Sequence, residues 1–290
     1  MNNLLCFGMG FCAQSLVTRL GSTSWRHLGT ARTPQGVETL QAAGFNAIQF
    51  GATLPDAAVL EHPLHVLVSA PPTTSGDPVL EAYSEQLSRL SASIRWLGYL
   101  STTGVYGDHR GAWVDEATPP APRTDRARRR VKAEHAWQAW GEANNVPVSL
   151  FRLAGIYGPG RNQLEGLRAG TARRIEKPGQ VFSRIHVDDV AMVLEASISQ
   201  PGRGELFNVC DDEPCAPEVV VAYAAQLLRV QPPSLEKYDL VKDTLSPMAA
   251  SFFDESKRVR NARIKEALGV KLQYPTYREG LKALQAKAIG

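Results

Sequence analysis

Short apolar runs alternate with longer amphipathic segments along the first half of the chain. The apolar runs predict buried strands at residues 4–7, 27–30, 47–50, 64–68, 96–100 and 148–151. The segments between them predict helices at residues 12–20, 37–43, 78–93 and 124–144. This alternation predicts an α/β fold with a doubly wound parallel sheet of the Rossmann type, because right-handed crossovers place helices on both faces of the sheet.

The regular alternation weakens after residue 155, where turn residues become frequent. We therefore expect two regions. Residues 1–155 form the dinucleotide-binding region, and residues 156–290 form a smaller mixed lobe for the substrate that is interleaved with the first region.

A glycine-rich turn connects the first predicted strand to the first predicted helix. Its sequence is Gly8-Met9-Gly10-Phe11-Cys12-Ala13, a GxGxxA pattern in the strand–turn–helix context that dinucleotide binding requires. Gly8 permits the tight turn, Gly10 lets a pyrophosphate approach the backbone, and Ala13 lets helix and strand pack closely. The helix N-terminus, with Phe11 and Cys12, offers free N–H groups to the phosphates. A plain tight turn is the alternative.

The residues after the other strands complete the predicted cofactor site. Sites for NAD usually carry Asp or Glu after the second strand to hold the ribose hydroxyls. This chain has Arg32 there and no acidic residue before Glu38, which favours NADP over NAD because a guanidinium can bind the 2′-phosphate. A solvent-facing arginine is the alternative. Ser69, Ala70 and Pro71 follow the fourth strand and are included among the cofactor-binding residues.

Composition and charge exclude several classes of protein. The chain has 290 residues, of which 43% are hydrophobic and 21% charged, as is ordinary for a folded domain. The net charge of +3 is too small to indicate a nucleic-acid partner, and no apolar run is long enough to cross a membrane. The four cysteines have no metal-ligand spacing, so we expect free thiols, no metal and a cytoplasmic location. The N-terminus lacks a basic leader, so a signal peptide fits poorly.

Several motifs occur in a fixed order along the chain. They are the GxGxxA loop, Ser101-Thr102-Thr103-Gly104-Val105-Tyr106-Gly107, Lys132-Ala133-Glu134, Arg152-Leu153-Ala154-Gly155-Ile156-Tyr157-Gly158-Pro159-Gly160-Arg161, Ile185-His186-Val187-Asp188-Asp189-Val190-Ala191, Phe207-Asn208-Val209, Arg258-Val259-Arg260-Asn261-Ala262-Arg263 and Tyr274-Pro275-Thr276-Tyr277-Arg278-Glu279-Gly280-Leu281. In this order they resemble the extended short-chain dehydrogenase/reductases, the group of the NAD(P)-dependent nucleotide-sugar epimerases and dehydratases. The resemblance covers nearly the whole chain.

The resemblance implies a catalytic Ser/Thr, a Tyr and a Lys, the last two as YxxxK on one helix. The Ser/Thr falls on Thr102 and the lysine on Lys132, which would also hold the nicotinamide ribose. The tyrosine position holds Arg128, and no tyrosine lies between Tyr106 and Tyr157. Arginine keeps its proton at any working pH and cannot act as the acid/base, although it can stabilise an anion.

Tyr106 is the nearest phenol that could replace the missing tyrosine, with a structural role in its loop as the alternative. Members of the family often have an asparagine that contacts the substrate's phosphate where this chain has Gly155. Arg161 and Arg184 are then candidate contacts for an anionic small-molecule substrate, and surface arginines in loops are the alternative. His186 and Asp189 match a family motif that holds the two lobes together.

Two functions remain open at this level. One is an atypical NADP-dependent oxidoreductase or epimerase-like enzyme, and the other is a catalytically silent dinucleotide-binding or redox-sensing protein.

A basic run at Arg126, Arg128, Arg129 and Arg130 predicts a solvated helix face, with phosphate or nucleic-acid binding as the alternative. An apolar stripe on the same predicted helix suits either a homodimer contact or the internal core. It comprises Val131, Ala133, Ala136, Trp137 and Trp140.

Overall fold

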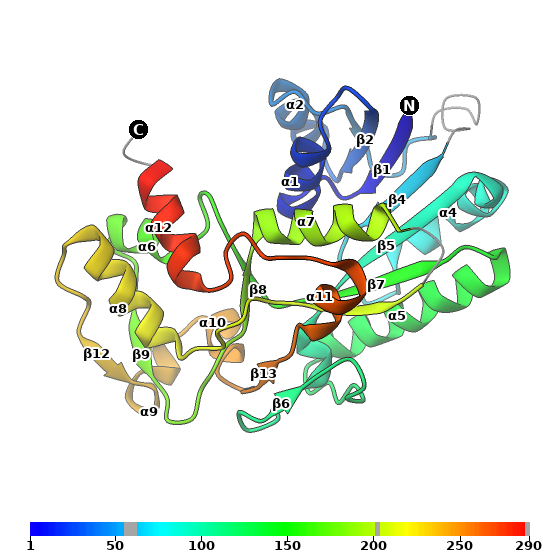
Figure 1. Ribbon diagram of the computed structural model, residues 1–290. Coiled ribbons are helices and arrows are strands. Elements are labelled where there is room, and N and C mark those ends of the chain that lie inside the picture. The colour runs from blue at the N-terminus through cyan, green and yellow to red at the C-terminus, as the bar shows by residue number, and fades with distance from the viewer. Residues whose placement is uncertain (55–62, 201–203, 288–290) are drawn as a thin grey trace.

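A seven-stranded parallel sheet forms the centre of the molecule (Figure 1). The computed structural model describes residues 1–54, 63–200 and 204–287. The strands of the sheet are β1 (Asn2–Phe7), β2 (Trp25–Ala31), β3 (Ala47–Gln49), β4 (Leu64–Val68), β5 (Ile94–Thr102), β7 (Val148–Leu153) and β11 (Leu206–Val209). Their order is β11-β7-β5-β4-β1-β2-β3, and every neighbouring pair is parallel. The predicted Rossmann-type fold is confirmed.

Helices cover both faces of this sheet, and the alternation of side chains along β1 shows how. The helices are α1 (Phe11–Leu20), α2 (Pro34–Ala42), α4 (Pro78–Arg89), α5 (Asp125–Asn144) and α7 (Val187–Ile198). Leu4 and Cys6 belong to the core that α1 and α7 cover. Leu5 and Phe7 belong to the core that α4 and α5 cover. Successive residues of a strand point to opposite faces, so both faces of β1 must be apolar.

The apolar stripe of α5 packs inside the chain. Ala133, Trp137 and Trp140 are buried against the sheet, where the Trp137 ring lies 6.3 Å from that of Tyr99 and 5.7 Å from that of Trp140. Ala136 is exposed. These three residues therefore belong to the internal core.

The basic run of α5 divides between solvent and sheet. Arg126 and Arg128 are exposed, as the prediction of a solvated face requires. Arg130 instead turns inward and donates from Nη1 to the Tyr99 hydroxyl at 2.9 Å and to the Leu100 carbonyl at 2.8 Å. The prediction is wrong for Arg130, because its long side chain reaches back to polar groups at the end of β5.

The remaining elements build a second lobe beside the carboxyl ends of the strands (Figure 1). In it β8 (Gly155–Tyr157) pairs with β10 (Arg184–His186), and β9 (Arg174–Glu176) pairs with β12 (Leu235–Lys237). Its helices are α6 (Gln163–Arg168), α8 (Pro217–Leu228), α9 (Tyr238–Val241), α10 (Pro247–Ser251) and α12 (Tyr277–Lys287). Tyr157, Leu164, Ala224 and Leu281 are in its core.

The two lobes are interleaved along the chain. After β8 and β10 have entered the second lobe, α7 returns to pack beside α1, and β11 adds the edge strand next to β7. Helix α11 (Ala262–Leu268) then packs near β11. A small ladder of β6 (Trp113–Val114) and β13 (Arg258–Val259) joins the loop after β5 to the C-terminal part. Short helical turns complete the description: η1 (Ser91–Ser93), η2 (Thr103–Tyr106) and η3 (Lys242–Thr244).

Candidate functional site

The glycine loop between β1 and α1 is held tightly against its neighbours. Gly8 has φ +91°, and a Cβ there would lie 2.9 Å from Ser69 Oγ and 3.1 Å from the Ala70 nitrogen. Its N–H donates to Thr30 Oγ1 at 2.9 Å. Both the backbone conformation and the lack of space therefore require glycine at this position.

The space beside Gly10 is open. Gly10 is the N-cap of α1, no side chain caps the helix, and a Cβ on Gly10 would meet nothing within 4 Å. The first N–H groups of a helix have no acceptor within it, and the helix dipole is positive at this end. The loop thus presents an uncapped, ten-residue helix to an open space, which is the arrangement that binds phosphates.

Cys12 and Ala13 are buried behind the loop, against the sheet. Burial raises the pKa of the Cys12 thiol to about 12, while the positive charge of Arg161 acts in the opposite direction. A thiol with so high a pKa is unreactive at neutral pH. Cys12 therefore contributes packing and its backbone N–H rather than thiol chemistry.

The end of β4 is tied to the same loop. Ser69 donates from its hydroxyl to the Gly8 carbonyl, and the Ser69 and Ala70 N–H groups donate to the Phe7 carbonyl at 2.9 and 3.0 Å. Pro71 follows and is exposed. These contacts place Ser69 and Ala70 at the border of the glycine loop, and their binding of the cofactor stays a prediction.

Arg32 follows β2 directly and is exposed. It has no hydrogen bond or ion pair with any other residue in the described part of the chain, while the next residue, Thr33, caps α2 by accepting from the Gly36 N–H at 3.1 Å. The guanidinium is therefore available at the end of β2, where a dinucleotide places its adenosine ribose.

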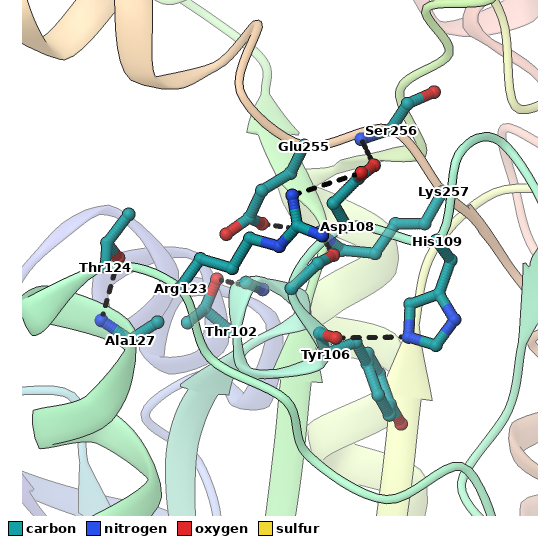
Figure 2. Close-up of polar contacts among 12 residues, drawn as sticks. Thr102, Tyr106, Asp108, His109, Arg123, Thr124, Ala127, Glu255, Ser256 and Lys257 are labelled. Atoms are coloured by element: carbon teal, nitrogen blue, oxygen red, sulfur yellow. Dashed lines mark hydrogen bonds and ion pairs between the residues drawn. The ribbon is translucent and has the colours of Figure 1, made fainter.

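Thr102 and Lys132 lie on neighbouring elements. Thr102 ends β5, is partly exposed, and accepts from the Gly104 N–H at 3.1 Å (Figure 2). Lys132 lies on α5, which packs against η2 immediately after Thr102. Its side chain is exposed and makes no hydrogen bond or ion pair within the described residues.

Arg128, which the resemblance aligns with the tyrosine position, is directed to the N-terminus of its own helix. Its Nη2 and Nε donate to Asp125 Oδ1 at 2.6 and 3.1 Å, and its Nη1 donates to the Arg123 carbonyl at 2.8 Å. The hydrogen bonds and charge of Arg128 lower the pKa of Asp125. The guanidinium thus already has a carboxylate partner.

Tyr106 is fully buried and held on two sides. Its hydroxyl donates to Asn208 Oδ1 at 2.8 Å, and the Arg152 guanidinium lies 4.8 Å from its ring centre. Burial raises the pKa of this phenol. The position favours the structural role over that of a replacement acid/base, because the hydroxyl has no open side toward a substrate.

A buried ion pair lies behind Tyr106. Arg152 Nη2 donates to Glu134 Oε2 at 2.7 Å and its Nε to Oε1 at 3.1 Å, while Ser101 donates to the same carboxylate. Both charged side chains are at most 5% exposed. Both residues stand in motifs of the sequence, but their pairing, which connects α5 with β5 and β7, is not visible in it.

The comparisons with known proteins agree with this geometry. Residues 78–210 match the model of the NAD dependent epimerase/dehydratase family. A functionally unknown conserved protein from Silicibacter pomeroyi is 50% identical with a TM-score of 0.91, and 99% of each chain is covered. Protein YeeZ of Escherichia coli K12 is 27% identical over 95% of this chain and 97% of its own. Over residues 78–210 the chain is thus similar to the NAD dependent epimerase/dehydratase family, and its fold is of the Rossmann type.

More distant solved structures were determined with a dinucleotide, which is NAD in some and NADPH in another. The human epimerase family protein SDR39U1, in complex with NADPH, is 18% identical, with a TM-score of 0.70, and 98% of this chain and 99% of that chain are covered. At this identity the likeness concerns the fold.

Arg161 lies in the turn that follows β8 and is exposed. It closes the turn after β8 by exchanging backbone hydrogen bonds with Gly158 at 3.0 and 3.1 Å. A Cβ on Gly158 would lie 3.0 Å from Cζ of Phe11, and the charge of Arg161 opposes the rise in the pKa of Cys12 that burial causes. The turn therefore lies against the start of α1.

Arg184 is buried in the second lobe, so the alternative of a surface arginine is wrong. Its guanidinium lies 5.5 Å from the ring centre of Tyr277, and its Nη2 is 3.4 Å from the Cys215 carbonyl. Its charge opposes the rise in the pKa of Asp211 that burial causes. The predicted contact of Arg184 with a substrate would require a ligand that enters this lobe.

His186 and Asp189 carry out the joining role that their motif predicts. The Asp189 carboxylate accepts from the backbone N–H groups of Gln273 and Tyr274 at 2.7 and 3.0 Å, and so fixes the segment that leads to α12. The His186 ring packs 4.2 Å from that of Tyr274. Burial lowers the pKa of His186 to about 4, so the ring is neutral at physiological pH.

Thiol pairing, metal binding and membrane insertion can be checked among the described residues. All four cysteines are free thiols. Within residues 1–54, 63–200 and 204–287, no group of three or more His, Cys, Asp or Glu could hold a metal ion. None of the helices described in that part of the chain is long and apolar enough to span a membrane.

Three residues of the site were not identified from the sequence. They are Thr30, which holds Gly8, and Glu255 and Lys257, which bridge the two lobes near Gly107 (Figure 2). Thr30 lies at the end of the second predicted strand, so its position was a usable signal. Glu255 and Lys257 come from the irregular C-terminal part, where nothing local indicates which loop they reach.

Proposed function

We propose that this protein binds NADP(H) at the carboxyl edge of its sheet and transfers a hydride between the cofactor and a small-molecule substrate. The observation that carries the proposal is the open, uncapped N-terminus of α1 beside Gly10. The NADPH complex of the human relative SDR39U1 supports it by analogy of fold.

Different residues around the loop bind different parts of the cofactor. Backbone N–H groups of Phe11, Cys12 and Ala13 bind the pyrophosphate, and Arg161 adds a positive charge from the turn above them. Arg32 binds the 2′-phosphate, for which its free guanidinium is suited. This phosphate is what distinguishes NADP from NAD.

The reaction side of the site keeps two of the three residues that the family uses. The bound cofactor supplies or accepts the hydride. Thr102 donates a hydrogen bond to the substrate oxygen, and Lys132 binds the nicotinamide ribose. Because Arg128 cannot release its proton near neutral pH, the proton that the substrate oxygen gains or loses is exchanged with water.

A second function, dinucleotide binding without turnover, is favoured by one observation. Arg128 is engaged by Asp125 and by the Arg123 carbonyl, so nothing with the chemistry of tyrosine occupies its place. A protein of this kind would sense the cofactor or its redox state. Free thiols fit a reducing compartment such as the cytoplasm for either function, and a homodimer remains a proposal for both.

Calorimetry with NADP⁺ and NAD⁺ tests the binding proposal. We expect tighter binding of NADP⁺. Equal affinities, or tighter binding of NAD⁺, would remove Arg32 from its proposed role. Absorbance assays with NADPH and a panel of carbonyl compounds and nucleotide-sugars then separate the two functions, because only the enzyme consumes NADPH in a substrate-dependent way.

A further inference from the structure

Two successive peptide units at the end of β1 are each held from both neighbouring strands. The Phe7 carbonyl accepts from the N–H groups of Ser69 and Ala70 at 2.9 and 3.0 Å, so the first unit is bound to the end of β4. The N–H group of the same unit, on Gly8, donates to Thr30 Oγ1 of β2 at 2.9 Å. The strand order β4-β1-β2 places these partners on opposite sides of the chain.

The next peptide unit, between Gly8 and Met9, is held in the same way. Its carbonyl accepts from the Ser69 hydroxyl, and its N–H group donates to the Thr30 carbonyl at 2.9 Å. The Met9 side chain is buried over β2, where a Cβ on Gly29 would meet its Cε. Thr30 and Ser69 therefore fix the direction of both peptide units.

The remaining backbone groups of the glycine loop are satisfied within the loop and α1. The Gly10 N–H donates to the Gly8 carbonyl at 2.9 Å, and Nε2 of Gln14 donates to the Met9 carbonyl at 2.9 Å. The Gln14 N–H donates to the Gly10 carbonyl at 2.9 Å and so begins the hydrogen bonding of α1. In this described loop, the N–H groups of residues 11–13 precede that bond and are left for a ligand.

The two hydroxyl groups can affect a ligand without touching it. Thr30 is 1% exposed, which excludes it from direct contact with a bound phosphate. Its hydroxyl acts through Gly8, whose N–H group it accepts, and Ser69 acts through the Gly8 carbonyl. A loop that is already held in its bound conformation binds more tightly, because binding then has to order no further part of the chain.

Resting on the proposed function, we infer that Thr30 and Ser69 are positioning residues for the dinucleotide. Their hydroxyl groups hold Gly8 from opposite sides, so that the N–H groups of residues 11–13 converge on the pyrophosphate. Because NADP⁺ and NAD⁺ share the pyrophosphate, loss of either hydroxyl weakens the binding of both. The competing explanation is that Thr30 contributes to folding alone.

The experiment measures the affinities of both dinucleotides by calorimetry and the thermal unfolding of each variant. Thr30→Val keeps the shape of the side chain and removes the acceptor, Thr30→Ser keeps the acceptor, and Ser69→Ala removes the hydroxyl on the other side. The matched control is Ser197→Ala. Ser197 is buried and its Oγ accepts from Trp96 Nε1 at 2.9 Å, so the control also loses a buried hydrogen bond, near the start of β5 and away from the glycine loop.

We expect Thr30→Val and Ser69→Ala each to weaken NADP⁺ and NAD⁺ binding about three- to tenfold, the range for one hydrogen bond. Thr30→Ser should restore the affinity of wild type. Ser197→Ala should lower the unfolding temperature as Thr30→Val does but leave both affinities unchanged, which a role in folding alone does not predict.

Unchanged affinities in a folded Thr30→Val protein would overturn the inference, as would an equal loss of affinity in Ser197→Ala. If Thr30→Val does not fold, Ser69→Ala decides by the same criterion. If wild type binds neither dinucleotide, the proposed function fails and inorganic pyrophosphate becomes the probe. Weaker pyrophosphate binding by Thr30→Val than by wild type then supports the inference, and equal or absent binding overturns it.

Discussion

The ends of β1 and β5 lie at the same edge of one sheet, but they differ in how much of the family's chemistry they retain. At the end of β1, Gly8 has the positive φ of a tight turn, and Gly10 opens the uncapped N-terminus of α1 to free space. At the end of β5, the resemblance assigns Thr102 to the reaction and Arg128 to the place of the acid/base, and Arg128 is paired with Asp125. The cofactor half and the reaction half of such a site can therefore change independently.

The largest effect is expected at the cofactor half. Gly10→Val should lower affinity for NADP⁺ by on the order of a thousandfold, about 4 kcal/mol, because the side chain occupies the space of the pyrophosphate. The fold should persist, since Gly10 has φ −88° and no atom lies within 4 Å of a Cβ there. Calorimetry measures the affinity and thermal unfolding monitors the fold. Normal binding by a folded Gly10→Val protein would place the phosphates elsewhere.

In the reaction half, the largest expected effect is a loss of stability. Glu134→Ala should lower the free energy of unfolding by about 3–5 kcal/mol, because it leaves the buried Arg152 guanidinium without its carboxylate. Urea unfolding measures the change, and Glu142→Ala, at an exposed position of the same helix, is the control. Equal stabilities of the two variants would show that the buried pair contributes nothing to the fold.

Arg32→Ala should weaken NADP⁺ binding by about 1.5–3 kcal/mol, the range for hydrogen bonds to a charged group. Affinity for NAD⁺ should change little, because NAD⁺ lacks the 2′-phosphate. Calorimetry with both cofactors provides its own control, and Arg95→Ala, an exposed arginine near the start of β5, controls for general charge effects. A parallel loss for both cofactors would contradict the assigned contact.

The smallest effect is expected at Arg128. Arg128→Ala should change both stability and NADP⁺ affinity by less than about 0.5 kcal/mol, because its ion pair with Asp125 is exposed at the surface. Asp125→Ala is the matched variant from the same pair. A large loss of NADP⁺ affinity in Arg128→Ala alone would place this residue in the cofactor site and would reduce the contrast between the two halves.

The sequence predicted most of the sheet but missed its edge. Six of the seven strands were found, because each is a short apolar run between amphipathic helices. The edge strand β11 was not predicted, since it has four residues and a polar Asn208 among its apolar ones. Its place is decided by pairing with β7, more than fifty residues earlier in the chain.

The glycine loop and the partners of the charged side chains show where prediction from sequence ends. The amino-acid sequence alone predicted the glycine loop, because the loop depends on residues close together along the chain. Only the tertiary structure paired Arg152 with Glu134 and buried Tyr106 against Asn208. A local backbone conformation follows from neighbouring residues, whereas the partner of a charged or polar side chain depends on which distant segment the packed core brings within a few ångströms.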